Sequence, residues 1–231
     1  MKHKRIDGPS RFYEIDGKRY ASVTSILSVI SKPALIAWAA KQGSLQNMLA
    51  TQQEAMDIGS SAHRIIEAHL KNEPYLLENE PREVQQAFAN FLEWAKQTNF
   101  QIVHSEFVCY SELGYAGTAD GIAKIDGELT VIDWKTSSGI YDDYWLQTEA
   151  YANAIDEMVA RKELQLFEEP ITNVSILRLS KKDGSFEAVT KKRDPRNLGT
   201  FVHAMHLWEW QQRCKEAYDN KNRRRKKRNS S

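Results

Sequence analysis

An aspartate and a lysine stand two positions apart inside the strand-forming stretch LTVIDWKTSS, residues 129–138. Side chains two apart in a strand point to the same face, so we expect Asp133 and Lys135 to project together, with Trp134 on the opposite face. An unpaired buried charge is costly. This strand end therefore holds either a plain Asp–Lys ion pair or a site that uses both charges.

Asp120 extends this pair into a possible metal site. It lies in AGTADGIA, and the Asp126-Gly127 turn predicts a hairpin that joins its strand to the strand of Asp133. Antiparallel neighbours are about 5 Å apart, so the two carboxylates should face each other and raise one another's pKa. Mg²⁺ or Mn²⁺ would relieve this repulsion, since both prefer oxygen ligands. Lys135 could then steady an attacking water or neutralise charge on a phosphoryl group.

Two helical pairs could complete the site. Gln147 and Tyr151 are four residues apart and share one helix face, as do Gly59 and His63. A glycine would let its helix approach the strand closely and bring His63 to the carboxylates, where a neutral imidazole is a good ligand for Mn²⁺. Taken singly, each of these residues also fits ordinary packing or an exposed surface.

The elements that must position these residues follow from hydrophobic periodicity and turn signals. We expect a hairpin over 12–22, helices over 22–30, 34–43, 48–71 and 81–98, strands over 100–110, 115–125 and 128–136, a helix over 141–163, strands over 171–180 and 185–192, and a closing helix over 194–219. This order predicts an α/β (α+β) domain with a small mixed β-sheet flanked by helices.

Composition narrows the class of protein. The chain has 231 residues, of which 41% are hydrophobic and 27% charged, as expected for one globular domain. Apolar runs stay well short of the roughly 20 residues that span a bilayer, and no apolar secretory signal is visible. We therefore expect no membrane partner and a cytoplasmic location. No G-x-x-x-x-G-K-[ST] motif is present, so no nucleotide cofactor is expected.

Cysteine usage and charge add two further expectations. Cys109 and Cys214 form no paired metal spacing and no disulfide framework, and they are too few for a four-cysteine iron–sulfur cluster. The last eleven residues, KNRRRKKRNSS, contain seven Lys and Arg and no acid, so the rest of the chain is acidic overall. We expect residues 219–231 to form a disordered basic tail, which would either be merely solvated or attract nucleic acid.

These motifs together resemble a known family. The RecB-type branch of the PD-(D/E)XK nuclease superfamily, which includes CRISPR-adaptation nucleases and the mitochondrial genome maintenance exonuclease, has a similar ordered set: Gly59-x-x-x-His63, Gly117-x-x-Asp120, Asp133-x-Lys135 and Gln147-x-x-x-Tyr151. The segment YASVTSIL…SKPALIAWAAKQG is similar to the start of the mitochondrial and phage-encoded relatives. This likeness implies that the cytoplasm is that of a bacterium or a phage-infected cell. The resemblance covers residues 12–155. Ala119 and Ala21 stand where prolines occur in the family patterns.

The resemblance implies a restriction-endonuclease-like core and a role for each motif. The implied metal ligands for one or two Mg²⁺ or Mn²⁺ ions are His63, Asp120, Asp133 and the backbone carbonyl of Trp134. Lys135 would be the catalytic lysine, with Gln147 and Tyr151 orienting it or the DNA backbone. Glu106 matches an acidic position of a second shell or second metal.

The expected domain plan has a hairpin and helical segment carrying the histidine motif at 1–99, a nuclease core with its closing helix at 100–218, and the tail, all in one globular domain. Tyr141, Tyr144 and Arg64 are candidate DNA-binding residues, since aromatic rings stack on unpaired bases and arginine pairs with phosphate.

The expected activity is a metal-dependent DNA exonuclease acting on single strands or DNA ends in recombination, repair or replication. A structure-specific flap endonuclease and a non-catalytic DNA-binding accessory protein with the same fold remain open, as does a metal-independent domain in which Asp133 and Lys135 merely pair.

Overall fold

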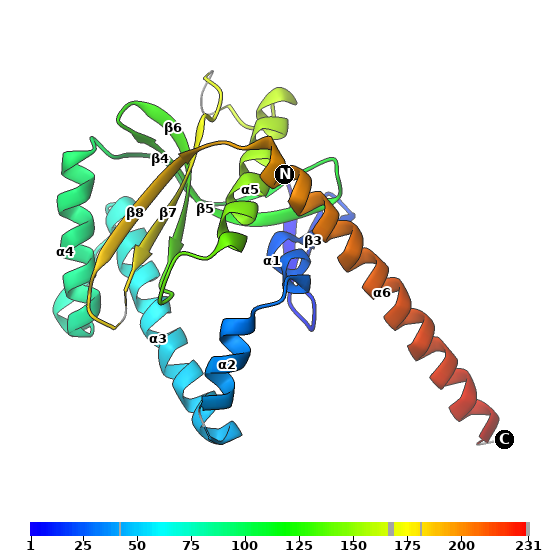
Figure 1. The fold of residues 1–231 in the computed structure, drawn as a ribbon. Coiled ribbons are helices and arrows are strands. Elements are labelled where there is room, and N and C mark those ends of the chain that lie inside the picture. Colours follow the sequence, from blue (N-terminus) through cyan, green and yellow to red (C-terminus); the bar gives the residue numbers. More distant parts are fainter. Residues whose placement is uncertain (42, 166–168, 181, 230–231) are drawn as a thin grey trace.

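The computed structural model describes residues 1–41, 43–165, 169–180 and 182–229 (Figure 1). Its elements follow in the order β1 (His3–Ile6), β2 (Phe12–Ile15), β3 (Lys18–Ser22), α1 (Val23–Ile26), η1 (Leu27–Val29), α2 (Pro33–Lys41), α3 (Leu45–Leu70), η2 (Leu77–Asn79), α4 (Arg82–Gln97), β4 (Gln101–Tyr110), β5 (Tyr115–Ile125), β6 (Glu128–Lys135), α5 (Asp142–Ala160), β7 (Asn173–Leu179), β8 (Phe186–Lys192) and α6 (Pro195–Asn229).

A single mixed sheet organises the described chain. Its strand order is β1-β2-β3-β5-β6-β7-β8, and β4 pairs with the other edge of β5. The contacts β3–β5 and β6–β7 are parallel, and the remaining pairs are antiparallel. Helix α5 connects the parallel neighbours β6 and β7, as a parallel pair requires. The expected mixed sheet flanked by helices is confirmed.

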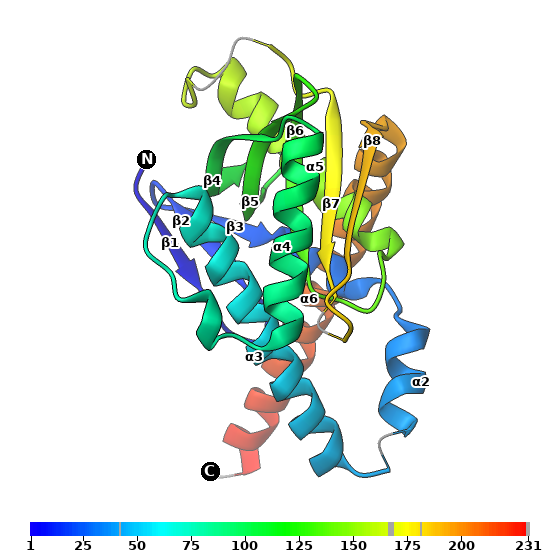
Figure 2. The ribbon, with the colours of Figure 1, turned by 90° about the vertical axis from the view of Figure 1, so that its left-hand side faces the viewer.

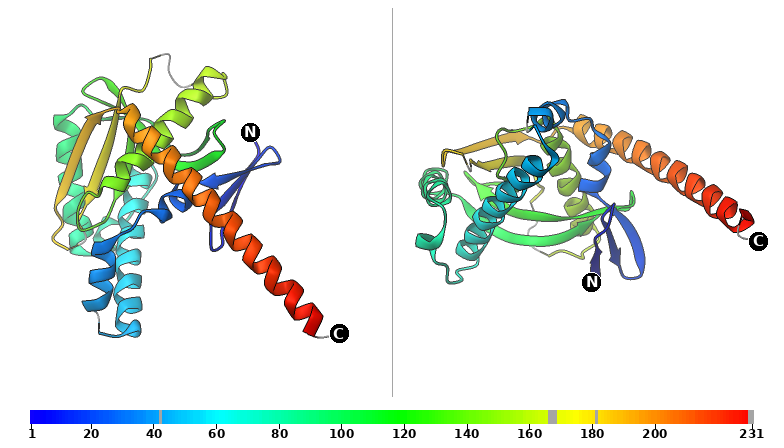
Figure 3. Two further views of the ribbon diagram at one scale, coloured as in Figure 1. Left: turned by 45° about the vertical axis from the view of Figure 1, so that its right-hand side comes forward. Right: turned by 90° about the horizontal axis from the view of Figure 1, so that it is seen from below.

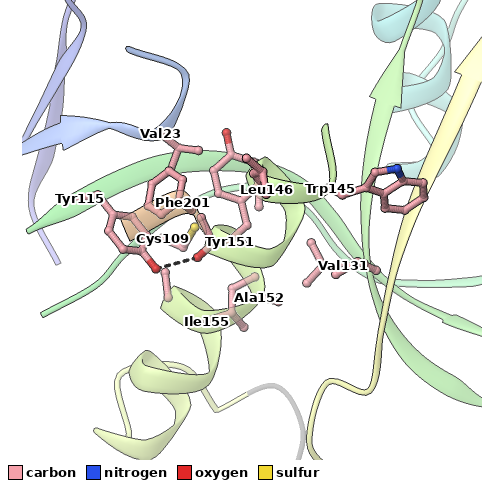
Figure 4. Packing of buried hydrophobic residues seen from close by; sticks show 14 of the residues in the cluster. Val23, Cys109, Tyr115, Val131, Trp145, Leu146, Tyr151, Ala152, Ile155 and Phe201 are labelled. Atoms are coloured by element: carbon pink, nitrogen blue, oxygen red, sulfur yellow. Dashed lines mark hydrogen bonds between the residues drawn. The ribbon is translucent and has the colours of Figure 1, made fainter. Parts of the chain in front are cut away.

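Helices cover both faces of the sheet (Figures 1 and 2). Helices α5 and α6 pack on one face around buried residues that include Val131, Ile155 and Phe201, and Figure 4 shows this packing from close by. Helices α3 and α4 cover the other face, where Phe88 and Phe91 pack on the sheet. Strand β6 lies between two apolar layers, which is why ELTVIDWK is almost continuously buried.

The edge of β5 that faces β3 and β6 is split. At its start, Tyr115 and Ala116 pair with β3. Further along, from Gly121 onward, the same edge pairs with β6. Between these two stretches, the described ladder gives residues 117–120 no strand partner on this edge, although residues 117–119 pair with β4 on the other. The sheet therefore opens beside Asp120.

Turn chemistry explains the hairpins. Asp16-Gly17 and Asp126-Gly127 both have positive φ at their two residues, as the tight turn between twisted strands requires. Ser22 caps α1 by accepting a hydrogen bond from the backbone N–H of Ser25 at 3.3 Å. The hairpin over 12–22 and the turn between β5 and β6 agree with the expectations from sequence.

The structure differs from those expectations in four places. The segment 22–30 is divided into α1 and the short 3-10 helix η1, and α3 begins before residue 48. Strand β1 was not expected, because HKRI is too polar to show an apolar alternation. Helix α6 continues through residues 219–229, and its C-terminal part extends away from the sheet (Figure 3). In the described part of the chain, no helix is both long and apolar enough to cross a membrane.

Candidate active site

The C-terminal end of β6 holds a connected polar network. Asp133 is 1% exposed, and its Oδ2 forms an ion pair with Nζ of Lys135. From α5, Gln147 donates through Nε2 to Oδ1 of Asp133 at 3.0 Å and accepts from Nζ of Lys135 at 3.2 Å. One amide side chain thus fixes both charged residues. Trp134 points the other way and packs against Phe91, with ring centroids 5.1 Å apart.

Asp120 reaches the same network across the split in the sheet. Gly121 pairs with Ile132, so Asp120 is the next residue along β5 toward Asp133. Its Oδ2 accepts a hydrogen bond from the backbone N–H of Trp134 at 2.8 Å. The carboxylate thereby satisfies a backbone donor of β6 just beyond the last pair of its ladder with β5.

Gly117 and Tyr151 determine how closely α5 approaches the opening. A Cβ atom at Gly117 would lie 2.4 Å from Cε1 of Tyr151, so only glycine leaves room for this ring. The buried Tyr151 hydroxyl accepts a hydrogen bond from Nε2 of Gln147 at 3.2 Å. The glycine of β5 and the Gln–Tyr pair of α5 therefore act together: Gly117 leaves room for the Tyr151 ring, and the Tyr151 hydroxyl holds the Gln147 amide.

His63 comes from α3, on the opposite side of the sheet from α5. Burial lowers the pKa of His63, although the charge of Asp133 and a hydrogen bond with the Trp134 backbone act in the raising direction. The ring is therefore neutral near pH 7, which is the form that binds metals. Gly59 lies in the same helix one turn before it.

All of these side chains line one open cavity of about 500 Å³, which contains His63, Asp120, Asp133, Lys135, Gln147 and Tyr151. Tyr144 also lines it, and Nζ of Lys135 lies 4.7 Å from the centre of its ring. Tyr141 is 41% exposed and its ring lies 5.6 Å from that of Tyr144. Arg64 instead pairs with Glu80, outside the lining of this cavity.

Glu106 lies at the rim in an unusual conformation. Its φ is +44°, which is rare for a residue other than glycine. Its neighbours in β4, Ser105 and Phe107, pair with Gly121 and Ala119, so Glu106 lies at the level of Asp120. A hydrogen bond with Glu67 raises the pKa of Glu106 and lowers that of Glu67. Lys71 pairs with Glu67 and lies 3.9 Å from the Glu106 carboxylate.

Sequence reasoning missed several residues of this rim. Glu67 follows His63 by four positions on α3, a spacing that could have revealed it. Arg5, Arg11 and Thr118 line the cavity itself, but nothing in their local sequence marks them.

A comparison with models of protein families identifies the family of this chain. The family model of the PD-(D/E)XK nuclease superfamily matches residues 37–191. The chain belongs to this superfamily. The match contains the histidine of α3, both aspartates, the lysine and the Gln–Tyr pair. No curated protein matches the sequence.

Two solved structures resemble this PD-(D/E)XK chain. The alkaline exonuclease LHK-Exo of Laribacter hongkongensis is 8% identical, with a TM-score of 0.46 over 89% of this chain and 94% of its own. The protein SSO0001 is 14% identical, with a TM-score of 0.41 over 82% of this chain and 74% of its own.

The donor set of this PD-(D/E)XK site fits a hard divalent cation. Burial, and then the charge of Asp133, raises the pKa of Asp120 to about 7. Oδ2 of Asp133 is buried and, among the described residues, has the ion pair with Lys135 but no hydrogen bond of regular geometry. Both carboxylates would be stabilised by a cation.

The described side chains do not form a complete set of metal ligands by themselves. No three carboxylate, imidazole or thiolate groups within the described ranges already converge as a ligand set. Asp120, Asp133, His63 and Trp134 all line the same cavity.

Proposed function

We propose that the protein is a metal-dependent DNA nuclease of the RecB-type branch that acts as an exonuclease on single strands or DNA ends. The observation that carries the proposal is the meeting of Asp120, Asp133 and Lys135 at the split in the sheet, inside an open cavity. Membership in the PD-(D/E)XK superfamily supports hydrolysis of a phosphodiester bond.

Asp120 and Asp133 would hold one or two Mg²⁺ or Mn²⁺ ions, with His63 as a further ligand. When bound, such an ion activates water and neutralises charge on the phosphoryl group. Lys135 would contribute its ammonium group to the developing negative charge. Burial acts to lower its pKa, but the charges of Asp133 and Asp120 outweigh burial and the pKa is raised. The lysine is therefore a cation rather than a base.

Gln147 would position the lysine. Its two hydrogen bonds, from Lys135 and to Asp133, hold the ammonium group beside the carboxylate. Its third bond, to the hydroxyl of Tyr151, fixes the amide orientation. These contacts pre-organise the charges, and electrostatic catalysis depends on such pre-organisation.

Unpaired bases would stack near Tyr141 and Tyr144. These rings lie where β6 passes into α5, and Tyr144 lines the cavity beside Lys135. Aromatic stacking is tolerant of sequence, as a nuclease without base specificity requires. A preference for single strands is the substrate choice that these rings favour.

The deciding experiment compares 5′- and 3′-end-labelled linear single-stranded DNA, its duplex form and circular single-stranded DNA. Each is incubated with Mg²⁺, Mn²⁺ or chelator. We expect cleavage of linear substrates only, no cleavage with chelator, and none with Lys135→Ala. Cleavage of the circle would instead identify an endonuclease, and DNA binding without cleavage under every condition would identify an accessory protein.

A further inference from the structure

Arg5 and Arg11 belong to the N-terminal hairpin, which is formed by β1 and β2. Both pair with the carboxylate of Asp7 at the rim of the cavity of about 500 Å³ that contains Asp120 and Lys135, called here the catalytic cavity. Arg5 donates from Nε to Oδ2 of Asp7 at 2.9 Å, and Arg11 donates from Nε to Oδ1 at 2.8 Å. Both arginines line the cavity that contains Asp120 and Lys135, whereas Asp7 does not. The guanidinium groups thus lie beside the space in which a substrate would have to lie.

Both arginines are anchored to the framework that carries the site. Arg5 pairs with Tyr13 across β1 and β2, and the Tyr13 hydroxyl lies 3.0 Å from Oγ1 of Thr118, two residues before Asp120. The backbone N–H of Arg11 donates to Oγ of Ser25 in α1 at 2.8 Å. The hairpin is therefore held in register with β5.

The carboxylate between the arginines is easily replaced. Side-chain exposures are 52% for Arg5, 39% for Arg11 and 55% for Asp7, and ion pairs this exposed contribute little to stability. Among the described residues, each guanidinium donates only through Nε, so its terminal amino groups remain available. Paired guanidinium forks match the geometry of phosphate at least as well as that of carboxylate.

We propose that Arg5 and Arg11 bind a backbone phosphate of the DNA strand near the one that is cleaved, and that the Asp7 carboxylate pairs with both guanidinium groups when DNA is absent. This inference rests on the proposed nuclease function and adds a strand-binding element to it. Asp7 then acts as an internal competitor that weakens binding of DNA.

A second cavity beside the catalytic one indicates where the DNA strand would continue beyond the two arginines. This cavity of about 860 Å³ shares Arg5, Tyr13, Glu106 and Thr118 with the catalytic cavity. The two cavities therefore adjoin at these residues, and Arg5 lies at their junction. A strand that leaves the catalytic residues toward the second cavity would pass Arg5, after Arg11 on the catalytic side.

The test measures binding apart from cleavage. Fluorescence anisotropy follows a labelled single-stranded oligonucleotide in the Lys135→Ala background, with chelator, over a salt series. Arg5→Ala/Arg11→Ala should weaken binding by roughly tenfold to a hundredfold at low salt. The slope of log Kd against log salt should fall by about 0.7, the value for one phosphate contact on a single strand. Asp7→Asn should tighten binding by at least about threefold.

Arg196→Ala is the matched control, because Arg196 also pairs with an aspartate, Asp194, but on the exposed start of α6. The proposal would be overturned if the double variant bound DNA with an affinity within twofold of this control and with the same salt slope. If the double variant fails to fold, Asp7→Asn still tests the proposal. If the Asp7 contacts only hold the hairpin together, Asp7→Asn should lower stability without tightening DNA binding, and that result would overturn the proposal.

Turnover in the Lys135-containing protein provides the second readout. In the double variant KM should rise while kcat at saturating DNA stays within about twofold, since the arginines bind the strand rather than the reacting atoms. An unchanged KM would contradict the proposal. If the wild-type protein never cleaves DNA but the arginine variants still lose DNA binding, only the nuclease function is refuted. The two failures are therefore distinguishable.

Discussion

Replacing Asp120 by asparagine should stabilise the cation-free protein at alkaline pH. Burial and the charge of Asp133 raise the pKa of Asp120 from 3.8 to about 7. The folded protein therefore binds this proton more tightly than the unfolded chain does. The resulting stability is fully present below about pH 4 and is lost as pH rises through 7. Asparagine carries no charge at any pH, and its amide oxygen can still accept from the Trp134 N–H.

The magnitude follows from the two pKa values. Each tenfold change in proton affinity corresponds to about 1.4 kcal/mol, so the interval from 3.8 to about 7 gives a ceiling of about 4 kcal/mol. Relative to wild type, the free energy of unfolding of Asp120→Asn should rise by up to this amount between pH 4 and pH 8. In a melting experiment this is a gain of roughly 10 °C.

Urea unfolding of both proteins in chelator, at several pH values from 4 to 9, measures this difference. Asp219→Asn, on the exposed part of α6, controls for removal of a remote carboxylate. Mn²⁺ should stabilise wild type but not Asp120→Asn, because the proposed ion site needs both carboxylates. Parallel pH dependence of wild type and Asp120→Asn in chelator would refute the electrostatic reasoning.

Four further outcomes are expected. Lys135→Ala should lower cleavage at least about a hundredfold with little change in DNA affinity, and unchanged cleavage would remove the lysine from the mechanism. Gly117→Ala should destabilise the protein by about 1–3 kcal/mol in urea, because its Cβ would overlap the Tyr151 ring, whereas an unchanged midpoint would show that the ring moves aside. Gln147→Leu should reduce kcat by about tenfold or more in a cleavage assay, unless Lys135 stays in place without it. His63→Gln should weaken Mn²⁺-supported cleavage most, and equal loss with Mg²⁺ and Mn²⁺ would argue for a packing role.

The sequence by itself determined the hairpins and the facing of the central charges. Aspartate-glycine pairs accept the positive φ of tight turns, so the β2–β3 and β5–β6 connections follow from local chemistry. Strand alternation alone puts Asp133 and Lys135 on one face and Trp134 on the other. Helical spacing pairs Gln147 with Tyr151 in the same way.

Only the tertiary structure decided how these pieces meet. The split edge of β5 arises because β3 and β6 pair with different parts of one strand, and no local pattern encodes which strands become neighbours. The entry of Tyr151 above Gly117 and the approach of Lys71 to Glu106 likewise join distant segments.

The N-terminal hairpin shows the limit of sequence reasoning most clearly. Arg5 and Arg11 belong to a polar segment without apolar alternation, so nothing local indicates a strand or a site. Their position at the catalytic cavity depends on the ladder with Tyr13 and on the bond from Arg11 to Ser25. Local sequence sets which way a side chain points from its own element, whereas long-range pairing sets what it points at.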